Sequence, residues 1–259
     1  MNLTILGTGA AYPGPGQACS GLLIQHRTTN ILIDCGTGVL SNLQNCLELY
    51  AVSDIIISHM HADHFVDLIP YRYALRYGFN GSLGICPRLY LPPGGIKAID
   101  HVVSPFSESA SFFADVFEVS EYNPDRALRL GNLDVKFVPV SHYIPAYAVS
   151  VSDSGKIAYS SDTGLCSGLS NVAQDADILV CNVGRCLEPD RDSLWGHLRP
   201  SEAGTVAREA RVQRLLLTHL WPNSNHIKSL DQAAHNFGGL TELAHECRTY
   251  DLGKVLASV

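Results

Sequence analysis

The sequence predicts an α+β fold in which two mixed β-sheets pack face to face and helices cover their outer faces. Short apolar segments of strand length recur along both halves of the chain, and segments with helical spacing of apolar residues follow them. No repeat with a period of about 20–50 residues is present. Elements in this order bury one face of each sheet against the other and one stripe of each helix outside. The 259 residues are expected to form a single domain, 1–259, large enough to bury a core without disulfides.

The first half opens with three apolar segments that are too short for helices and have the composition of buried strands. Predicted strands are Leu3–Leu6, Gly21–Gln25, Asn30–Asp34, Asp54–Ser58 and Arg88–Leu91. Predicted helices are Thr37–Leu49, Asp67–Tyr77 and Gly95–Val103. The polar and aromatic region 104–123 predicts no element.

The second half repeats this order. Predicted strands are Leu133–Val140, Tyr147–Val151, Lys156–Ser160, Ile178–Asn182, Arg214–Thr218 and a last one at Val255–Ala257. Predicted helices are Ser201–Ala210 and Leu230–Phe237. Ser201 is the expected N-cap of its helix, and Glu202 then lies too early to complete a capping box.

Composition and charge exclude several classes of function and location. A net charge of −7 argues against a general surface for polyanions, although a metal site would supply local positive charge for one phosphate. The N-terminus has no basic segment followed by a long apolar one, and the apolar runs are too short to cross a bilayer, so neither a signal peptide nor a membrane span is expected. Eight scattered cysteines form no C-x-x-C pair, which favours reduced thiols and a cytoplasmic location.

One cluster of histidines carries the strongest functional signal. Ser58-His59-Met60-His61-Ala62-Asp63-His64 follows an apolar strand directly. His59 and His61 are two residues apart, so on an extended segment they point the same way and can share one metal. Asp63 and His64 lie where the chain must turn and can face a second metal. Imidazole and carboxylate ligands together suit Zn²⁺, with Mn²⁺ and Fe²⁺ as alternatives.

Three later segments each place one such side chain just after an apolar strand. They are Val138–His142, Ala158–Asp162 and Leu215–His219. Taken singly, a histidine in such a place could cap a strand, and Asp162 before Thr-Gly could open a turn. Taken together, all three end strands in the same way as the 59–64 cluster.

This ordered pattern of H-x-H-x-D-H, a histidine, an aspartate in S-D-T-G and a late T-H resembles the metallo-β-lactamase superfamily. The resemblance runs from about residue 3 to residue 220. It implies a four-layer αβ/βα sandwich with two divalent metals at the edge between the sheets. By this resemblance His59, His61 and His142 hold one metal, Asp63, His64 and His219 hold the other, and Asp162 bridges them.

Further motifs resemble ribonuclease Z and its relatives: Leu6–Pro13 (L-G-T-G-A-A-Y-P), Ser20–Ile24, Ile33–Gly36, and Gly196-His197 before a Pro-Ser-Glu-Ala helix start. In that group a histidine at the place of His197 reaches the active site. The basic arm that grips tRNA is absent, since the interval 143–161 holds one lysine and no arginine. The chain is therefore more similar to the compact relatives, and tRNA is not the expected substrate. Relatives of ribonuclease Z are often homodimers, so the resemblance also implies a homodimer.

The expected activity is that of a phosphodiesterase acting on a small-molecule or nucleotide diester. A hydroxide bridging the two metals would attack phosphorus, Asp63 would orient it, and His197 would protonate the leaving group or stabilise its charge. Arg185 lies just past a strand and Arg199 follows His197, so either could contact a phosphate; a solvated surface position is the better interpretation of each. Gly7-Thr-Gly9 does not open a dinucleotide site, because Tyr12 replaces the third glycine and two prolines follow; a tight turn at the rim of the active site is the better interpretation.

Three alternatives remain open at this stage. The same dinuclear site could hydrolyse a carboxylic ester, a thioester or a lactone. Iron could support redox chemistry: His61 stands where di-iron relatives that reduce oxygen carry Glu, but sulfur dioxygenases keep the histidine. A non-catalytic binding module is disfavoured by the complete ligand set, since decayed members lose ligands.

Overall fold

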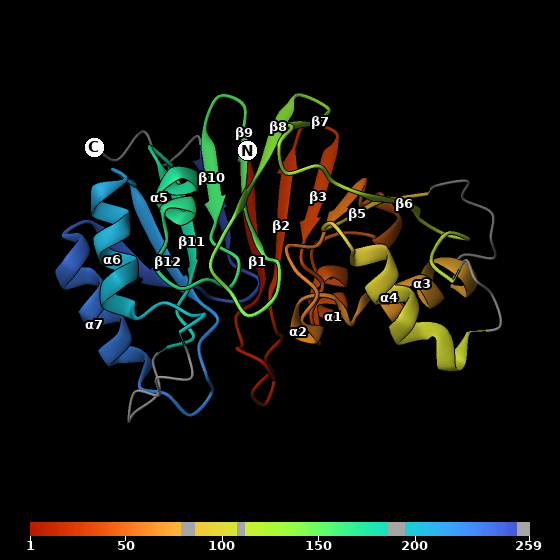
Figure 1. Ribbon diagram of the computed structural model, residues 1–259, viewed down its shortest axis with the longest axis horizontal. Coiled ribbons are helices and arrows are strands. Elements are labelled where there is room, and N and C mark those ends of the chain that lie inside the picture. The colour runs from red at the N-terminus through yellow and green to blue at the C-terminus, as the bar shows by residue number, and fades with distance from the viewer. Residues whose placement is uncertain (79–85, 108–111, 186–194, 253–259) are drawn as a thin grey trace.

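The computed structural model describes residues 1–78, 86–107, 112–185 and 195–252. Two seven-stranded sheets lie face to face, and helices cover the outer face of each (Figure 1). The predicted αβ/βα sandwich is confirmed. None of the described helices is long and apolar enough to cross a membrane.

The first sheet has the order β14-β1-β2-β3-β4-β5-β6. Its strands are β1 (Asn2–Gly7), β2 (Gly21–His26), β3 (Thr29–Ile33), β4 (Asp54–Ile56), β5 (Arg88–Leu91), β6 (Glu118–Glu121) and β14 (Thr249–Asp251). The pairs from β3 to β6 are parallel, whereas β14, β1, β2 and β3 pair antiparallel. Helices α1 (Val39–Gln44), α2 (Ala62–Phe65), α3 (Leu68–Tyr77) and α4 (Gly95–Val103) accompany this sheet. Single 3₁₀ turns lie at Leu49–Ala51 and Ser104–Phe106.

The second sheet has the order β13-β12-β11-β10-β9-β8-β7. Its strands are β7 (Leu128–Leu130), β8 (Leu133–Pro139), β9 (Tyr147–Ser152), β10 (Lys156–Tyr159), β11 (Ile178–Asn182), β12 (Arg214–Thr218) and β13 (Leu240–Leu243). The pairs from β10 to β13 are parallel. Helices α5 (Ser167–Ala173), α6 (Pro200–Glu209) and α7 (His226–Phe237) cover its outer face (Figure 1).

The core has three layers, as a sandwich of this kind requires. The central layer lies between the sheets and contains fully buried residues such as Ile5, Ile33 and Leu216. One outer layer joins the first sheet to α1, α3 and α4 through residues such as Leu43 and Tyr71. The other joins the second sheet to α5, α6 and α7. These layers hold the strand ends rigidly, and the polar cluster is built on those ends.

Several boundaries differ from the sequence prediction. The helix predicted over Thr37–Leu49 spans only Val39–Gln44, because the chain turns after α1 and enters a 3₁₀ turn. Ser201 is not the N-cap of α6: Arg199 is the N-cap, with Pro200 at the first helical position. Glu202 therefore stands at the third helical position, and its carboxylate accepts a hydrogen bond from the Arg199 backbone N–H at 2.8 Å. The strand predicted at Val255–Ala257 lies outside the described residues.

Candidate metal centre

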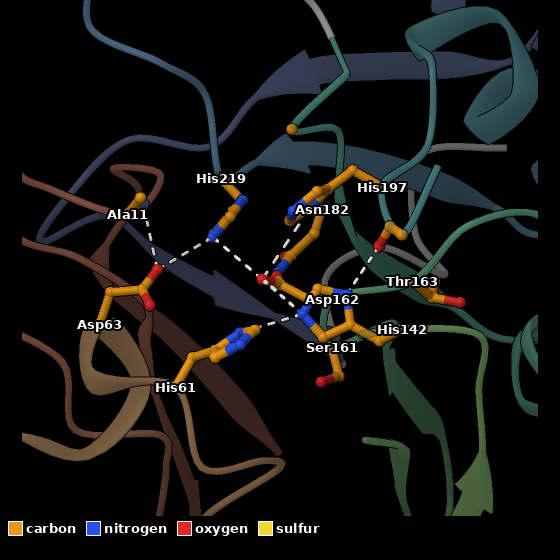
Figure 2. Close-up of polar contacts among 12 residues, drawn as sticks. Ala11, His61, Asp63, His142, Ser161, Asp162, Thr163, Asn182, His197 and His219 are labelled. Atoms are coloured by element: carbon orange, nitrogen blue, oxygen red, sulfur yellow. Dashed lines mark hydrogen bonds and ion pairs between the residues drawn. The ribbon is translucent and has the colours of Figure 1, made fainter. Parts of the chain in front are cut away.

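The polar residues that follow the apolar strands converge at one edge of the sandwich. His59 comes three residues after β4, His142 three after β8, Asp162 three after β10, and His219 directly after β12. Asp63 and His64 lie on α2, a one-turn helix whose N-cap is His61. Figure 2 shows side chains from both sheets pointing toward a common centre. The structure thus brings together all seven residues that the sequence analysis assigned to metals.

The first group of ligand atoms consists of one nitrogen each from His59, His61 and His142, with Asp162 beside them. His61 Nδ1 lies 3.2 Å from His59 Nε2 and 3.0 Å from His142 Nε2. Asp162 Oδ2 lies 3.7 Å from His59 Nε2 and 3.8 Å from His142 Nε2. Atoms bound tetrahedrally to one Zn²⁺ at roughly 2.0–2.1 Å are about 3.3–3.4 Å apart, so the spacing fits a shared cation.

Hydrogen bonding alone does not explain the first group. His142 Nδ1 donates to the Gly196 carbonyl at 2.8 Å, so the Nε2 of this neutral ring carries a lone pair and no proton. The Ser58 hydroxyl donates to Asp34 Oδ2 and the Ser161 hydroxyl donates to Ser58 Oγ. His59 Nδ1 therefore donates to these hydroxyls, at 3.1 and 3.3 Å, and the lone pair of this ring is on Nε2. A single proton on His61 Nδ1 can satisfy only one of these two lone pairs. A cation satisfies all three nitrogens at once.

The second group consists of Asp63, His64 and His219, again with Asp162. His219 Nε2 lies 3.2 Å from Asp63 Oδ2 and 3.3 Å from Asp162 Oδ2. His64 Nε2 lies 3.6 and 3.5 Å from the same two oxygens. Asp162 Oδ2 belongs to both groups, so this oxygen could contact a cation held by either of them.

Charge in the cluster also fits cations. Burial lowers the pKa of His59, His61 and His142 below the usual imidazole value, so these rings are neutral and carry lone pairs. Burial opposes the charge on Asp162, but His219 and His64 outweigh it and hold the pKa of this carboxyl well below its usual range. Within the described residues, His64 Nε2 is buried and makes no hydrogen bond. Burial would lower the pKa of His64, but the carboxylates of Asp162, Asp34 and Asp63 outweigh it and raise that pKa, so a bound cation would take the place of a proton on this ring. Three neutral imidazoles and ionised carboxylates form a donor set that suits divalent metals.

His197, the predicted acid, lies against both groups. Its ring stacks on His219 with centroids 5.4 Å apart, and it meets the His142 ring edge-on at 5.1 Å. Its Nδ1 is 3.9 Å from Asp162 Oδ2 and has no hydrogen-bond partner among the described residues. Burial is the main cause that lowers the pKa of His197 to about 4. The side chain therefore lies beside the shared carboxylate, at the position that the sequence predicted.

Asp34 is a functional residue that the sequence analysis missed. It is fully buried at the end of β3, and its two oxygens accept four hydrogen bonds. The donors are the backbone N–H and hydroxyl of Ser58 at 2.7 and 2.8 Å, Tyr159 OH at 2.9 Å and His64 Nδ1 at 2.7 Å. Asp34 thereby fixes the proton of His64 on Nδ1 and turns Nε2 toward the centre. A lone acidic residue at the end of an apolar strand, within the motif Ile33–Gly36, was the available signal.

The sequence analysis also missed Asn182, a single polar residue at the end of the apolar strand β11. Its side-chain amide donates to Asp162 Oδ1, which leaves Oδ2 to face both groups (Figure 2).

Three residues of the centre have a left-handed backbone: Asp34, Ser161 and His219, with φ of 60°, 54° and 56°. Such a conformation costs on the order of 1–3 kcal/mol in a residue other than glycine and persists where surrounding contacts enforce it. Among the described residues eight non-glycine residues have a positive φ, and these three, together with Ala11 at the rim, lie at the centre.

The glycine turn after β1 lies at the rim of this centre, as predicted. Gly9 forms a β-bridge with Leu220, which follows His219. The Ala11 backbone N–H donates to Asp63 Oδ2 at 3.0 Å (Figure 2). A side chain at Gly7 would overlap the Cys19 carbonyl, so this close approach requires glycine.

Comparison with known proteins agrees with this geometry. The model of the family described as Anti-Pycsar protein Apyc1 matches residues 1–183, more than half of the chain. The chain belongs to this family. An uncharacterized protein of Mycobacterium tuberculosis is 30% identical over 92% of this chain and 88% of its own. A ribonuclease Z of Myxococcus xanthus is 28% identical over 97% of this chain and 98% of its own.

A solved structure extends the comparison from sequence to fold. The crystal structure of the metallo-β-lactamase fold protein YhfI from Bacillus subtilis matches with a TM-score of 0.85 and 26% identity, over 96% of this chain and 98% of that one. YhfI is described as a probable metallo-hydrolase. The predicted membership of the metallo-β-lactamase superfamily, near its ribonuclease Z-like branch, is confirmed.

Proposed function

We propose that this protein is a metal-dependent phosphodiesterase with two divalent metal ions at the shared centre. The observation that carries the proposal is the position of Asp162 Oδ2, which lies within 3.9 Å of five imidazole nitrogens. Two groups of ligand atoms that share one oxygen, with a further histidine beside them, are what a two-metal hydrolytic site needs. The name of the Myxococcus xanthus relative adds support, because RNA is a phosphodiester polymer.

The metals supply the chemistry that the side chains cannot: when bound, they make a nucleophile available near neutral pH and neutralise charge on the phosphoryl oxygens. His59, His61 and His142 would hold one ion, and Asp63, His64 and His219 the other. Zn²⁺ is the proposed metal, because imidazole and carboxylate ligands at tetrahedral spacing suit it.

The remaining residues orient the metal ligands and the nucleophile, or act on the leaving group. Asp34 and Asn182 fix His64 and Asp162, so that the ligand atoms are aligned before substrate arrives. Asp63 is held by Ala11 N–H and can orient the attacking nucleophile. His197 can stabilise the leaving oxygen by donating a hydrogen bond from Nδ1, which faces the centre and makes no hydrogen bond within the described residues. Because burial lowers the pKa of His197 to about 4, the ring is neutral near pH 7, and it donates a proton only where the charge of a bound diester raises that pKa.

A parallel assay tests the proposal. Metal-replete protein would be given bis(p-nitrophenyl) phosphate, a homoserine lactone and an S-acyl thioester at equal concentration. We expect metal-dependent release of p-nitrophenol at a rate far above lactone or thioester hydrolysis. Preferred hydrolysis of the lactone or the thioester would replace this proposal with acyl-ester hydrolysis on the same centre. Activity that survives complete metal removal would contradict both.

A further inference from the structure

The turn that follows β1, residues 8–18 and here called the rim turn, depends on hydrogen bonds more than on burial. Residues 11, 12 and 15–17 are exposed to solvent, and a cavity of about 260 Å³ lies beside the turn, lined in part by Thr8, Gln17 and Glu246. The Ala18 carbonyl closes the turn, because it accepts from the Thr8 backbone N–H at 2.9 Å. A segment with so little apolar contact opens easily unless further polar contacts hold it.

The Glu246 carboxylate supplies those contacts. Its Oε1 accepts from the Ala18 backbone N–H at 2.9 Å and from Thr8 Oγ1 at 3.3 Å, so one oxygen binds both ends of the rim turn. Its Oε2 accepts from Asn42 Nδ2 at 2.9 Å, and the same amide donates to the Leu6 carbonyl at 2.7 Å. Because Ala18 is buried, loss of this carboxylate would leave its N–H without a protein partner.

Glu246 is itself held in place by strands of both sheets. It lies on the connection between β13 of the second sheet and β14 of the first. Before it, the Ala244 N–H donates to the Leu217 carbonyl on β12 at 2.8 Å. After it, the Cys247 N–H donates to the Ile5 carbonyl on β1 at 2.8 Å. The carboxylate is therefore fixed relative to the two strands that lead to the rim turn and to His219.

The rim turn contacts the centre at two places. The Ala11 N–H donates to Asp63 Oδ2 at 3.0 Å, and the same oxygen lies 3.2 Å from His219 Nε2 (Figure 2). The Leu220 N–H, which follows His219, donates to the Thr8 carbonyl at 3.1 Å. A displacement of the rim turn would thus reach two residues of the second group of ligands.

We propose that Glu246 is a positioning residue for the second group: by binding both ends of the rim turn, it holds the Ala11 N–H against Asp63. This inference rests on the proposed two-metal function and adds a residue that contacts neither metal nor substrate. A fixed N–H donor keeps Asp63 in the side-chain conformation that directs Oδ2 toward His64 and His219. Removal of such an outer partner typically lowers metal affinity or activity by about 10- to 100-fold.

Two substitutions at Glu246 remove this support to different degrees. Glu246→Ala removes all three hydrogen bonds. In Glu246→Gln the amide carbonyl can still accept from Ala18 and Thr8, but the NH₂ group then faces the Asn42 amide, donor against donor, and the charge is lost. Glu242→Ala is the matched control, because Glu242 lies on β13 and its carboxylate pairs with Arg248 Nη2 at 2.9 Å.

Hydrogen exchange followed by mass spectrometry reads the rim turn without an activity assay. In metal-replete Glu246→Ala, we expect the peptide that covers residues 8–18 to exchange roughly 10-fold faster or more, since hydrogen bonds to a charged group are lost. Glu246→Gln should show a smaller increase. Glu242→Ala should leave exchange in residues 8–18 unchanged.

Metal titration and kinetics separate positioning from a general effect on stability. When metal-free Glu246→Ala is titrated with Zn²⁺ against a chromogenic chelator, one of the two affinities should fall about 10- to 100-fold and the other should stay unchanged. With bis(p-nitrophenyl) phosphate, kcat should fall and KM should not, because the nucleophile loses its orientation. Glu242→Ala should keep both affinities and kcat, even where its melting temperature falls.

Exchange in residues 8–18 that is as slow in Glu246→Ala as in the unmodified protein would overturn the inference. Metal affinities and kcat equal to those of Glu242→Ala would do the same. Should Glu246→Ala fail to fold, the same measurements on Glu246→Gln decide, and values equal to those of the unmodified protein count against Glu246. Should the unmodified metal-replete protein hydrolyse no phosphodiester, the proposed function fails instead, and hydrogen exchange and metal titration still decide the role of Glu246.

Discussion

Substitution of Asp34 by asparagine tests how far the metal ligands depend on buried support. Asp34 contacts no predicted metal directly, and its carboxylate is fully buried among Ser58, His64 and Tyr159. Its φ is 60°, a left-handed value that asparagine tolerates better than most residues. Asp34→Asn therefore removes the charge and leaves the shape and the backbone in place.

The magnitude follows from the four hydrogen bonds that the carboxylate accepts. An asparagine carbonyl can replace only one of its two oxygens, so the amide NH₂ must face at least one N–H or O–H donor. Loss of one hydrogen bond to a charged group costs about 1.5–3 kcal/mol of stability. An asparagine carbonyl at the place of Oδ2 still accepts from His64 Nδ1 but carries no negative charge, so His64 Nε2 becomes a weaker ligand. We therefore expect metal affinity to fall roughly 10- to 100-fold.

Competition between the metal-free protein and a chromogenic chelator measures that affinity, and thermal unfolding measures stability. Asp54→Asn is the matched control: Asp54 is also fully buried, but it begins β4 and binds Ser53 Oγ at 2.7 Å and Arg88 Nη2 at 2.8 Å. The control should lose stability and keep its metal affinity. Equal metal affinity in Asp34→Asn and the unmodified protein would refute the role given to Asp34.

Further predictions concern the centre itself. His197→Ala should lower kcat for a diester with a poor leaving group by roughly 10²–10⁴-fold, and less for a p-nitrophenyl ester, with metal content unchanged; loss of metal would make His197 a ligand or a structural residue. Asp63→Ala should lose metal and activity together, measured by elemental analysis and turnover, whereas an active protein with full metal content would contradict its placement. Chelation should lower the melting temperature in calorimetry, since ligand at a hundredfold excess over its dissociation constant stabilises by about 2.7 kcal/mol; an unchanged melting temperature would count against bound metal.

The sequence predicted the interior strands well and missed all four edge strands. Interior strands such as Ile178–Asn182 are buried on both faces and appear as continuous apolar runs. The edge strands β6, β7, β13 and β14 are short and mix polar with apolar residues, as in Glu118–Glu121 and Leu128–Leu130. Edge strands pair on one side only, so their sequences carry a weaker periodic signal. Helix α5 was missed because Ser167–Ala173 is short and contains Gly and Asn, which disfavour helix.

The residues of the candidate centre also fall into those that the sequence predicted and those that it did not. Residues that face a shared point from strand ends, such as His142 and His219, could be identified because each follows an apolar run. Asp34 and Asn182 also follow apolar runs, but their role depends on which distant side chains they meet: Asp34 contacts Tyr159 from the other sheet. Contacts between sheets are tertiary and leave no local pattern. The left-handed backbone at Ser161 and His219 could not be predicted either, because few serines or histidines adopt it and tertiary contacts decide which ones do.

Anomalous diffraction from crystals grown with Zn²⁺, recorded at the zinc absorption edge, tests the central claim most directly. The account predicts two strong peaks per chain, one beside His59, His61 and His142 and one beside Asp63, His64 and His219, with Asp162 Oδ2 between them. A well-ordered centre with no peak, or with zinc bound only elsewhere on the protein, would contradict it.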